Sequence, residues 1–217
     1  MLNNLFKSDV FDDFSRFMLT ISGLLLIIFL ILHLASLSSI FVDADFFEKY
    51  SDWLHSSQLI HYFELSLVTI STIHIFLTSR KLYLNKKLGN NARLISKRND
   101  LLGSISAKLQ PICGTILLAF VIIHLSQLRF PHPISGKEIY TIKETLEKPL
   151  FYLLYILSGF ALSFHLFHGG ESSFRSLGIL NKKNKVLIRF ITRRFALTLG
   201  LGFSLVALFL GKSFKLI

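Results

Sequence analysis

The chain has 217 residues, of which 52% are hydrophobic and only 17% are charged, and its mean hydropathy is +0.55. This composition leaves too little polar surface for an ordinary soluble domain and predicts an integral membrane protein. The net charge of +11 could indicate a nucleic-acid-binding protein, but the basic residues lie between the apolar runs, as membrane topology requires. We therefore expect no nucleic acid among its partners.

The single cysteine, Cys113, excludes an internal disulfide and a CxxCH site for covalent haem attachment. The first apolar run follows a polar, partly acidic stretch and is too long for the apolar core of a signal peptide. We expect no cleaved signal.

In chain order, residues 1–16 mix apolar and charged side chains, which predicts either a short amphipathic helix on the membrane surface or disorder. The first apolar run can cross a hydrocarbon core of about 30 Å at a helical rise of about 1.5 Å per residue. Residues 43–57 are expected to form a short acidic connection. We predict an all-α protein with one membrane domain, 1–217, and spans over about 17–42, 59–79, 109–128, 150–168 and 195–210.

Two of these boundaries rest on particular residues. Pro111 lies close to the start of the third span, and proline is tolerated in a first helical turn. Gly169 and Gly170 follow the fourth apolar run and predict its end.

The distribution of Lys and Arg predicts the orientation. The stretches 80–108 and 171–194, which follow the second and fourth spans, hold eight and seven of these residues. The stretches 43–57 and 129–149 hold one and four. By the positive-inside rule, the richer side and the N-terminus are cytoplasmic, which predicts a multi-pass protein of the cytoplasmic (inner) membrane.

Four histidines lie in four different apolar runs and reveal an internal repeat. His33 and His124 are 91 positions apart, and so are His74 and His165. Two copies of a helical hairpin, each carrying two histidines, explain this offset. The similarity extends to the neighbours, since Gly23, Leu26, Phe29, His33, Leu34 and Leu37 recur as Gly114, Leu117, Phe120, His124, Leu125 and Leu128.

The predicted orientation converts sequence positions into depths. His33 and His124 lie on helices that run outward and share a level in the outer half of the membrane. His74 and His165 lie on helices that run inward and share a level in the inner half. The two levels differ by about ten residues, or roughly 15 Å at helical rise.

Two facing histidines at each of two levels suit two haems, each held by two imidazoles inside a four-helix bundle, with the fifth helix outside it. Gly23 and Gly114 lie ten residues before His33 and His124, at the inner level. A missing side chain at that level could admit the edge of a porphyrin.

Other interpretations remain open at this point. A single histidine in a span is often an interhelical hydrogen-bonding residue, although four in matched levels favour a cofactor. No carboxylate or cysteine joins either level to complete a tetrahedral zinc site. His168 lies one turn after His165, but the 91-residue offset favours His165 as the ligand. His61 and Glu64, near the outer mouth of the second span, form either an interfacial pair or a site for proton exchange or quinone.

The sequence resembles the single-subunit, di-haem cytochrome b membrane anchors of succinate:quinone oxidoreductases, the cytochrome b558 type, over nearly its whole length. The similarity is carried by FLILHLAS around His33, TISTIHIFLTSRKLY around His74, LQPICGTILLAFVIIHL around His124 and SFHLFHGGESSF around His165. A fifth span without histidine also fits this family.

The resemblance implies two b haems as cofactors, an outer one held by His33 and His124 and an inner one held by His74 and His165. It also implies two soluble partners on the cytoplasmic face, an iron-sulfur subunit and a flavoprotein subunit. Electrons would pass between succinate or fumarate and a membrane quinone, often menaquinone in this family.

We expect no activity toward succinate from this chain alone, since it has no flavin or dicarboxylate motif. Two alternatives remain: a cytochrome b anchor of a hydrogenase or formate dehydrogenase, and a transporter without haem. The repeat argues against the first. The second usually shows broken helices or several acids within the membrane.

Overall fold

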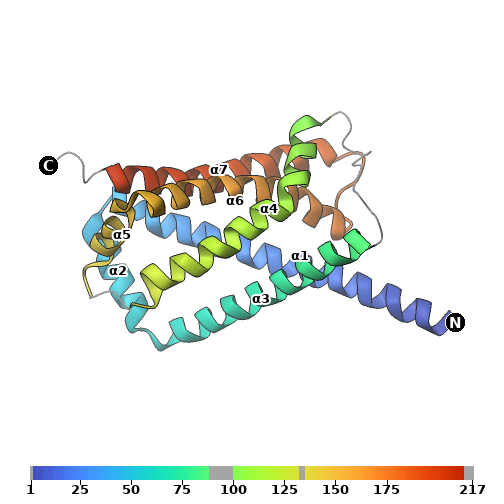
Figure 1. Ribbon diagram of the computed structural model, residues 1–217, viewed down its shortest axis with the longest axis horizontal. Helices are drawn as coiled ribbons and strands as arrows, with labels where there is room; N and C mark the ends of the chain where they lie inside the picture. Colours follow the sequence, from blue (N-terminus) through green and yellow to red (C-terminus); the bar gives the residue numbers. More distant parts are fainter. Residues whose placement is uncertain (1, 88–99, 132–134, 213–217) are drawn as a thin grey trace.

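The computed structural model describes residues 2–87, 100–131 and 135–212. Within these residues all regular secondary structure is helical, and five helices are long and apolar enough to cross a membrane. They run along one elongated bundle (Figure 1). The predicted all-α class and the five candidate spans are confirmed. The long helices are α1 (Leu2–Ser38), α3 (Gln58–Lys87), α4 (Leu101–His124), α6 (Pro149–Ser176) and α7 (Lys185–Lys212).

Two short helices, α2 (Ala44–Ser56) and α5 (Glu138–Glu147), lie at the end of the bundle opposite the N-terminus (Figure 1). We call these the α2–α5 end and the N-terminal end. The expected acidic connection is therefore mostly helix. Asp43 begins α2 by accepting a hydrogen bond from the Phe46 N–H at 3.0 Å. The Glu48 carboxylate of α2 accepts from the first N–H groups of α5, which joins the two helices.

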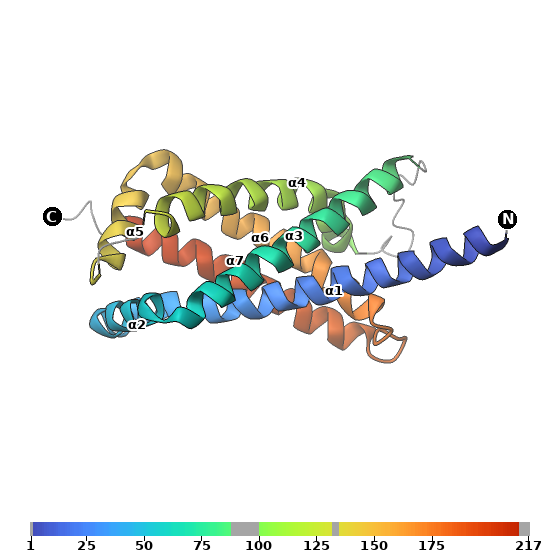
Figure 2. The same ribbon diagram turned by 90° about the horizontal axis from the view of Figure 1, so that it is seen from below.

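The helix α1 begins at Leu2 and runs without interruption into the first span. Figure 2 shows its N-terminal part extending beyond the other helices. A separate surface helix or a disordered segment over residues 1–16 was therefore the wrong prediction for the residues described. The physical reason is that neither glycine nor proline occurs before Gly23, so nothing in the backbone breaks the helix.

The helix α4 begins at Leu101, eight residues before the predicted boundary, and Pro111 lies inside it. Its start is set by Asp100, whose side chain accepts a hydrogen bond from the Gly103 N–H at 3.0 Å. Proline inside a helix removes one backbone hydrogen bond and favours a bend. Figure 1 shows α4 bent in its first half. The placement of Pro111 in a first turn was wrong.

The helix α6 passes through Gly169 and Gly170 and ends at Ser176. Its stop is Gly178, which adopts a positive φ of 71° and donates from its N–H to the Arg175 carbonyl. The predicted stop at the two earlier glycines was wrong because glycine weakens a helix interior by only about 1 kcal/mol without ending it. At Gly170 the missing side chain instead leaves room for Thr192 of α7.

The apolar core lies along the contact between α6 and α7. One cluster, near the middle, contains Leu162 and Leu166 of α6 with Ala196 and Leu199 of α7. A second, toward the α2–α5 end, joins Leu146 of α5 to α7. The helices α1 and α4 pack against this pair and α3 packs against α1, and the four histidines project from α1, α3, α4 and α6.

Candidate functional site

The structure brings the four histidines together as two pairs. The ring centroids of His33 on α1 and His124 on α4 are 6.1 Å apart, and the rings meet at 77°. The centroids of His74 on α3 and His165 on α6 are 6.4 Å apart, with the rings at 62°. These are the pairs that the depths in the sequence predict. Each pair takes one histidine from each half of the repeat.

Two glycines give the separation of the pairs. A Cβ atom on Gly23 would lie 3.3 Å from Cε1 of His74, so this residue of α1 lies at the level of the second pair. His33 follows ten residues later on the same helix, a rise of about 15 Å. Gly114 has the same relation to His165, with a corresponding distance of 3.5 Å. The two pairs therefore lie one above the other along the bundle.

The spacing within each pair fits one metal ion between two imidazoles. A metal–nitrogen bond to histidine is about 2 Å, and the nitrogen lies about 1 Å from the ring centre, so two rings on opposite sides of an ion would have centroids about 6 Å apart. All four side chains are partly exposed within the bundle. Among the described residues no group of three or more His, Cys, Asp and Glu could hold a metal ion. Each pair thus presents two imidazole rings, with no further His, Cys, Asp or Glu of the described residues grouped beside them.

The Nδ1 atom of His74 lies within hydrogen-bond distance of a side chain of α1. It lies 3.2 Å from the Ser22 hydroxyl oxygen, and that hydroxyl donates its only proton to the Leu19 carbonyl at 3.0 Å. Because the Ser22 proton goes to Leu19, the hydroxyl oxygen is free to accept from the ring, which assigns the His74 proton to Nδ1 and the lone pair to Nε2.

The second half of the repeat has a related arrangement at His165. Its Nδ1–Cε1 edge faces Gly114, as the same edge of His74 faces Gly23. The backbone carbonyl beside the ring is that of Gln110, which corresponds to Leu19 at the 91-residue offset. No hydrogen bond to the buried Nδ1 meets the usual geometry within the described residues. Both histidines of this pair thus turn the same edge toward the preceding helix of their own hairpin.

Gly23 and Gly114 make a different contact from the one the sequence predicts. The side-chain atoms near Gly23 and Gly114 belong to histidine rings, so the missing side chains let these rings approach the helix backbone. The admission of a porphyrin edge stays a prediction. The contact in the structure is with the proposed ligands themselves.

The two histidines of the His33–His124 pair have different neighbours. Nδ1 of His124 lies 3.2 Å from the Tyr155 hydroxyl of α6. His33 instead has aromatic neighbours, with the Phe29 ring stacked at 5.3 Å and the Phe203 ring at 5.8 Å. The sequence analysis missed Tyr155, although its position ten residues before His165 places it at the level of His124.

Glu64, which the sequence places near His61 at the mouth of the second span, is bound by an arginine from another helix. Arg129 binds the Glu64 carboxylate with both Nε and Nη2, the latter at 3.0 Å from Oε2. Arg129 ends a π-helical turn, Leu125–Arg129, that extends α4. This pair joins α3 to α4 toward the α2–α5 end. The sequence analysis missed it because Arg129 was assigned to the loop.

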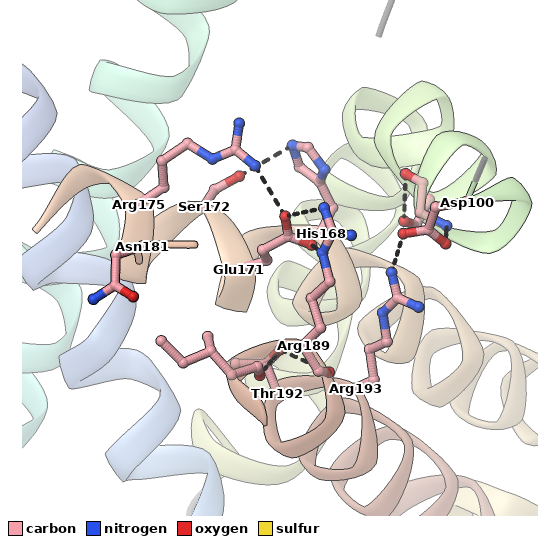
Figure 3. Close-up of polar contacts among 12 residues, drawn as sticks. Asp100, His168, Glu171, Ser172, Arg175, Asn181, Arg189, Thr192 and Arg193 are labelled. Carbon is pink, nitrogen blue, oxygen red and sulfur yellow. Dashed lines mark hydrogen bonds and ion pairs between the residues drawn. The ribbon is translucent and has the colours of Figure 1, made fainter. Parts of the chain in front are cut away.

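A second polar cluster lies beyond His165 toward the N-terminal end. The Glu171 carboxylate is 3% exposed and accepts from Arg175 at 2.9 Å and from Arg189 at 3.1 Å. Arg193 of α7 binds Asp100 at the start of α4 and lies over the Phe167 ring at 4.7 Å. Figure 3 shows these groups converging from α4, α6 and α7.

Several basic residues are therefore part of helices rather than loops. Arg189 and Arg193 belong to α7, which begins ten residues before the predicted fifth span. Burial alone would raise the pKa of Asp100, but the Gly103 N–H and Arg193 outweigh it and hold that pKa below its ordinary value. His168 points into the same region, where its Nε2 lies 3.3 Å from the Ser172 hydroxyl. The ring that faces His74 is that of His165.

Comparison with known proteins found no match for this chain, either among protein-family models, among curated proteins or among solved structures. What the structure defines is an all-helical protein with five candidate membrane spans and two histidine pairs, one above the other.

Proposed function

We propose that this chain is the cytochrome b membrane anchor subunit of a succinate:quinone oxidoreductase and carries electrons between an iron-sulfur subunit and membrane quinone through two b haems. The proposal adopts the family resemblance of the four histidine contexts. The observation that carries it is the pairing of His33 with His124 and of His74 with His165, at ring separations of 6.1 and 6.4 Å.

The residues fit the cofactor in number and chemistry. Two neutral imidazoles per site are the ligand set of low-spin b haem, and the apolar surroundings favour a macrocycle over a hydrated ion. Hydrogen bonds to Nδ1 of His74 and His124 leave Nε2 as the ligating nitrogen in each case. When bound, haem would supply reversible one-electron chemistry.

The protein residues would supply position and environment. Two sites separated by about 15 Å along helices that cross the membrane provide two steps for an electron between its faces. Four of the helices supply one ligand each, so relative helix positions set the geometry of both sites. The apolar residues around the rings exclude water and thereby influence the redox potential.

The proposed orientation places the N-terminal end in the cytoplasm. The stretches after the second and fourth spans carry most of the Lys and Arg residues and would lie on that side. An iron-sulfur subunit with its flavoprotein partner is the proposed occupant of this face. A quinone, with menaquinone as the first candidate, is the proposed electron partner in the membrane.

The first test is the spectrum of the purified protein with whatever subunits co-purify. We expect about two protohaems per chain in a pyridine haemochrome assay and the low-spin b-type bands of a reduced-minus-oxidised spectrum. Succinate should then reduce these bands in the intact complex. A colourless protein made with ample haem would refute the proposal and favour a transporter or a structural role for the histidines. If hydrogen or formate reduces the haem and succinate does not, the chain belongs to another respiratory dehydrogenase.

A further inference from the structure

The Tyr155 hydroxyl connects His124 to a second polar side chain. It lies 3.2 Å from Nδ1 of His124 and donates to Oε1 of Gln127 at 3.2 Å. Its ring packs edge-on against Phe120 with centroids 4.9 Å apart, which fixes the direction of the hydroxyl. Gln127 lies in the π-helical turn that follows α4. His124, Tyr155 and Gln127 thus form one chain of contacts between α4 and α6.

The direction of the hydrogen bonds follows from the number of protons. A tyrosine hydroxyl has one proton to donate and can accept as well. Because that proton goes to Gln127, the hydroxyl oxygen must accept from the His124 ring. The proton of neutral His124 is therefore on Nδ1, and Nε2 carries the free lone pair. Donation to Gln127 also polarises the hydroxyl and makes it a better acceptor.

The other half of the repeat lacks this arrangement. The position 91 residues before Tyr155 is Glu64, as His33 is the position 91 residues before His124. Both Glu64 oxygens are bound by Arg129. The His33 ring instead packs against the aromatic rings of Phe29 and Phe203. The two halves of the chain carry histidines at equivalent positions. The side chains that contact His33 and His124 differ, however, because His124 has a tyrosine hydroxyl and His33 has phenylalanine rings.

We propose that Tyr155 is a positioning residue that holds His124 as the Nδ1–H tautomer and makes it a stronger electron donor than His33 toward a shared metal. A histidine that donates from its second nitrogen is a more basic ligand through the first. Gln127 supports this role by accepting the tyrosine proton. The electronic part of the proposal rests on the proposed function, whereas the tautomer part concerns the protein alone.

The test compares Tyr155→Phe with Tyr152→Phe in the intact complex. Tyr152 lies on the same helix, one turn earlier, and packs against Gly211 and the apolar cluster around Leu146. A more basic ligand stabilises ferric iron, so its loss should raise the midpoint potential of one b haem in Tyr155→Phe. The other potential and the content of two haems should stay unchanged, and Tyr152→Phe should leave both potentials as they are. Equal potentials in Tyr155→Phe and the wild type, with both haems present, would overturn the proposal and leave the proposed function standing.

A second readout is independent of haem. Nitrogen-15 spectra of histidine-labelled protein in detergent separate the two neutral tautomers, and the His124 signal is identified by its loss in His124→Gln. In protein prepared without haem, where Nε2 carries no metal, we expect the Nδ1–H form in the wild type and in Tyr152→Phe, with a shift toward a mixture in Tyr155→Phe. An Nε2–H form in the wild type would contradict the assignment, whether or not the protein binds haem. If Tyr155→Phe fails to fold, Gln127→Leu serves in its place and should give a smaller change in the same direction.

Discussion

Gly159 on α6 and Gly200 on α7 face each other so closely that a Cβ atom on Gly159 would lie 2.5 Å from the Gly200 carbonyl oxygen. No real Cβ atom occupies such a position, so a side chain here must push the helices apart. Ser204 lies next to the same contact and donates to the Ile156 carbonyl at 2.9 Å. Small residues at a crossing of this kind let two membrane helices approach closely.

Gly159→Ala is therefore expected to destabilise the protein. Overpacking of this kind costs about 1–3 kcal/mol, which corresponds to a fall of several degrees in the unfolding temperature. The control is Gly169→Ala on the same helix, where the nearest atom, in Gln110, is 3.9 Å from the new Cβ. That variant should unfold at the wild-type temperature or slightly above it, because alanine favours helix. Thermal unfolding followed by circular dichroism in detergent measures both, and equal temperatures for the two variants would contradict the close packing.

The histidine pairs predict which substitutions remove the same cofactor. His33→Ala and His124→Ala should each lose one haem, and His74→Ala and His165→Ala should each lose the other, because one ligand of two is missing. Redox titration with haem analysis identifies which species remains. The control is His168→Ala, which lies outside both pairs and should retain two haems. The pairing would be wrong if His33→Ala and His165→Ala left the same species.

Glu138 predicts a dependence of stability on pH at the α2–α5 end. Burial, together with the nearby carboxylates of Glu48 and Asp52, raises its pKa to about 7, against the opposing effect of Arg129. His55 lies 3.1 Å from its Oε1 atom. In the unfolded chain this carboxyl would lose its proton near its ordinary pKa of 4.5.

Between these two values the unfolded state binds fewer protons than the folded state, so the contribution of Glu138 lowers stability as the pH rises from about 4.5 to about 7. Glu138→Gln removes this contribution and should flatten the unfolding temperature over that interval. The backbone N–H of residue 138 keeps its bond to Glu48 in this variant. Glu144→Gln, an exposed position on the same helix, serves as the control and should follow the wild-type curve. A Glu138→Gln curve that is as steep as the wild-type one would exclude this residue as the cause.

The buried Glu171 predicts an unequal effect of single and double substitutions. Glu171→Met leaves Arg189 without its carboxylate in a partly buried site and should lower stability by about 3 kcal/mol. The double variant Glu171→Met/Arg189→Met removes both charges and should recover much of the loss. Arg194→Met is the matched control. It removes an arginine of the same helix whose guanidinium lies over the Phe190 ring at 4.8 Å instead of on Glu171. Urea or thermal unfolding in detergent compares them, and additive losses in the double variant would count against the ion pair.

The depths of the histidines could be predicted from the sequence because helical rise is constant. Once His33 and His74 lie on adjacent antiparallel spans, their levels follow from counting, and the 91-residue offset extends the count to the second half. The structure places the rings accordingly. Ligation of haem is a further step that stays a prediction.

The neighbours of the histidines could not be predicted in the same way, because depth does not give the direction of a side chain around its helix. Tyr155 shares a level with His124, but its contact depends on how α6 is rotated against α4. The pairing of Glu64 with Arg129 likewise depends on an extra π-helical turn that apolar periodicity does not reveal. Helix ends were the least predictable part, since the Asp100 cap moved the start of α4 well before Pro111.

The distribution of the histidines over the two halves has a consequence for assembly. The hairpin of α1 and α3 carries His33 and His74, and the hairpin of α4 and α6 carries His124 and His165. Neither hairpin contains a complete pair, so each emerges from synthesis with two half-sites. A cofactor bound between the rings of each pair would join the two hairpins at two levels. Under the proposed function, insertion of haem and final docking of the two hairpins would therefore depend on each other.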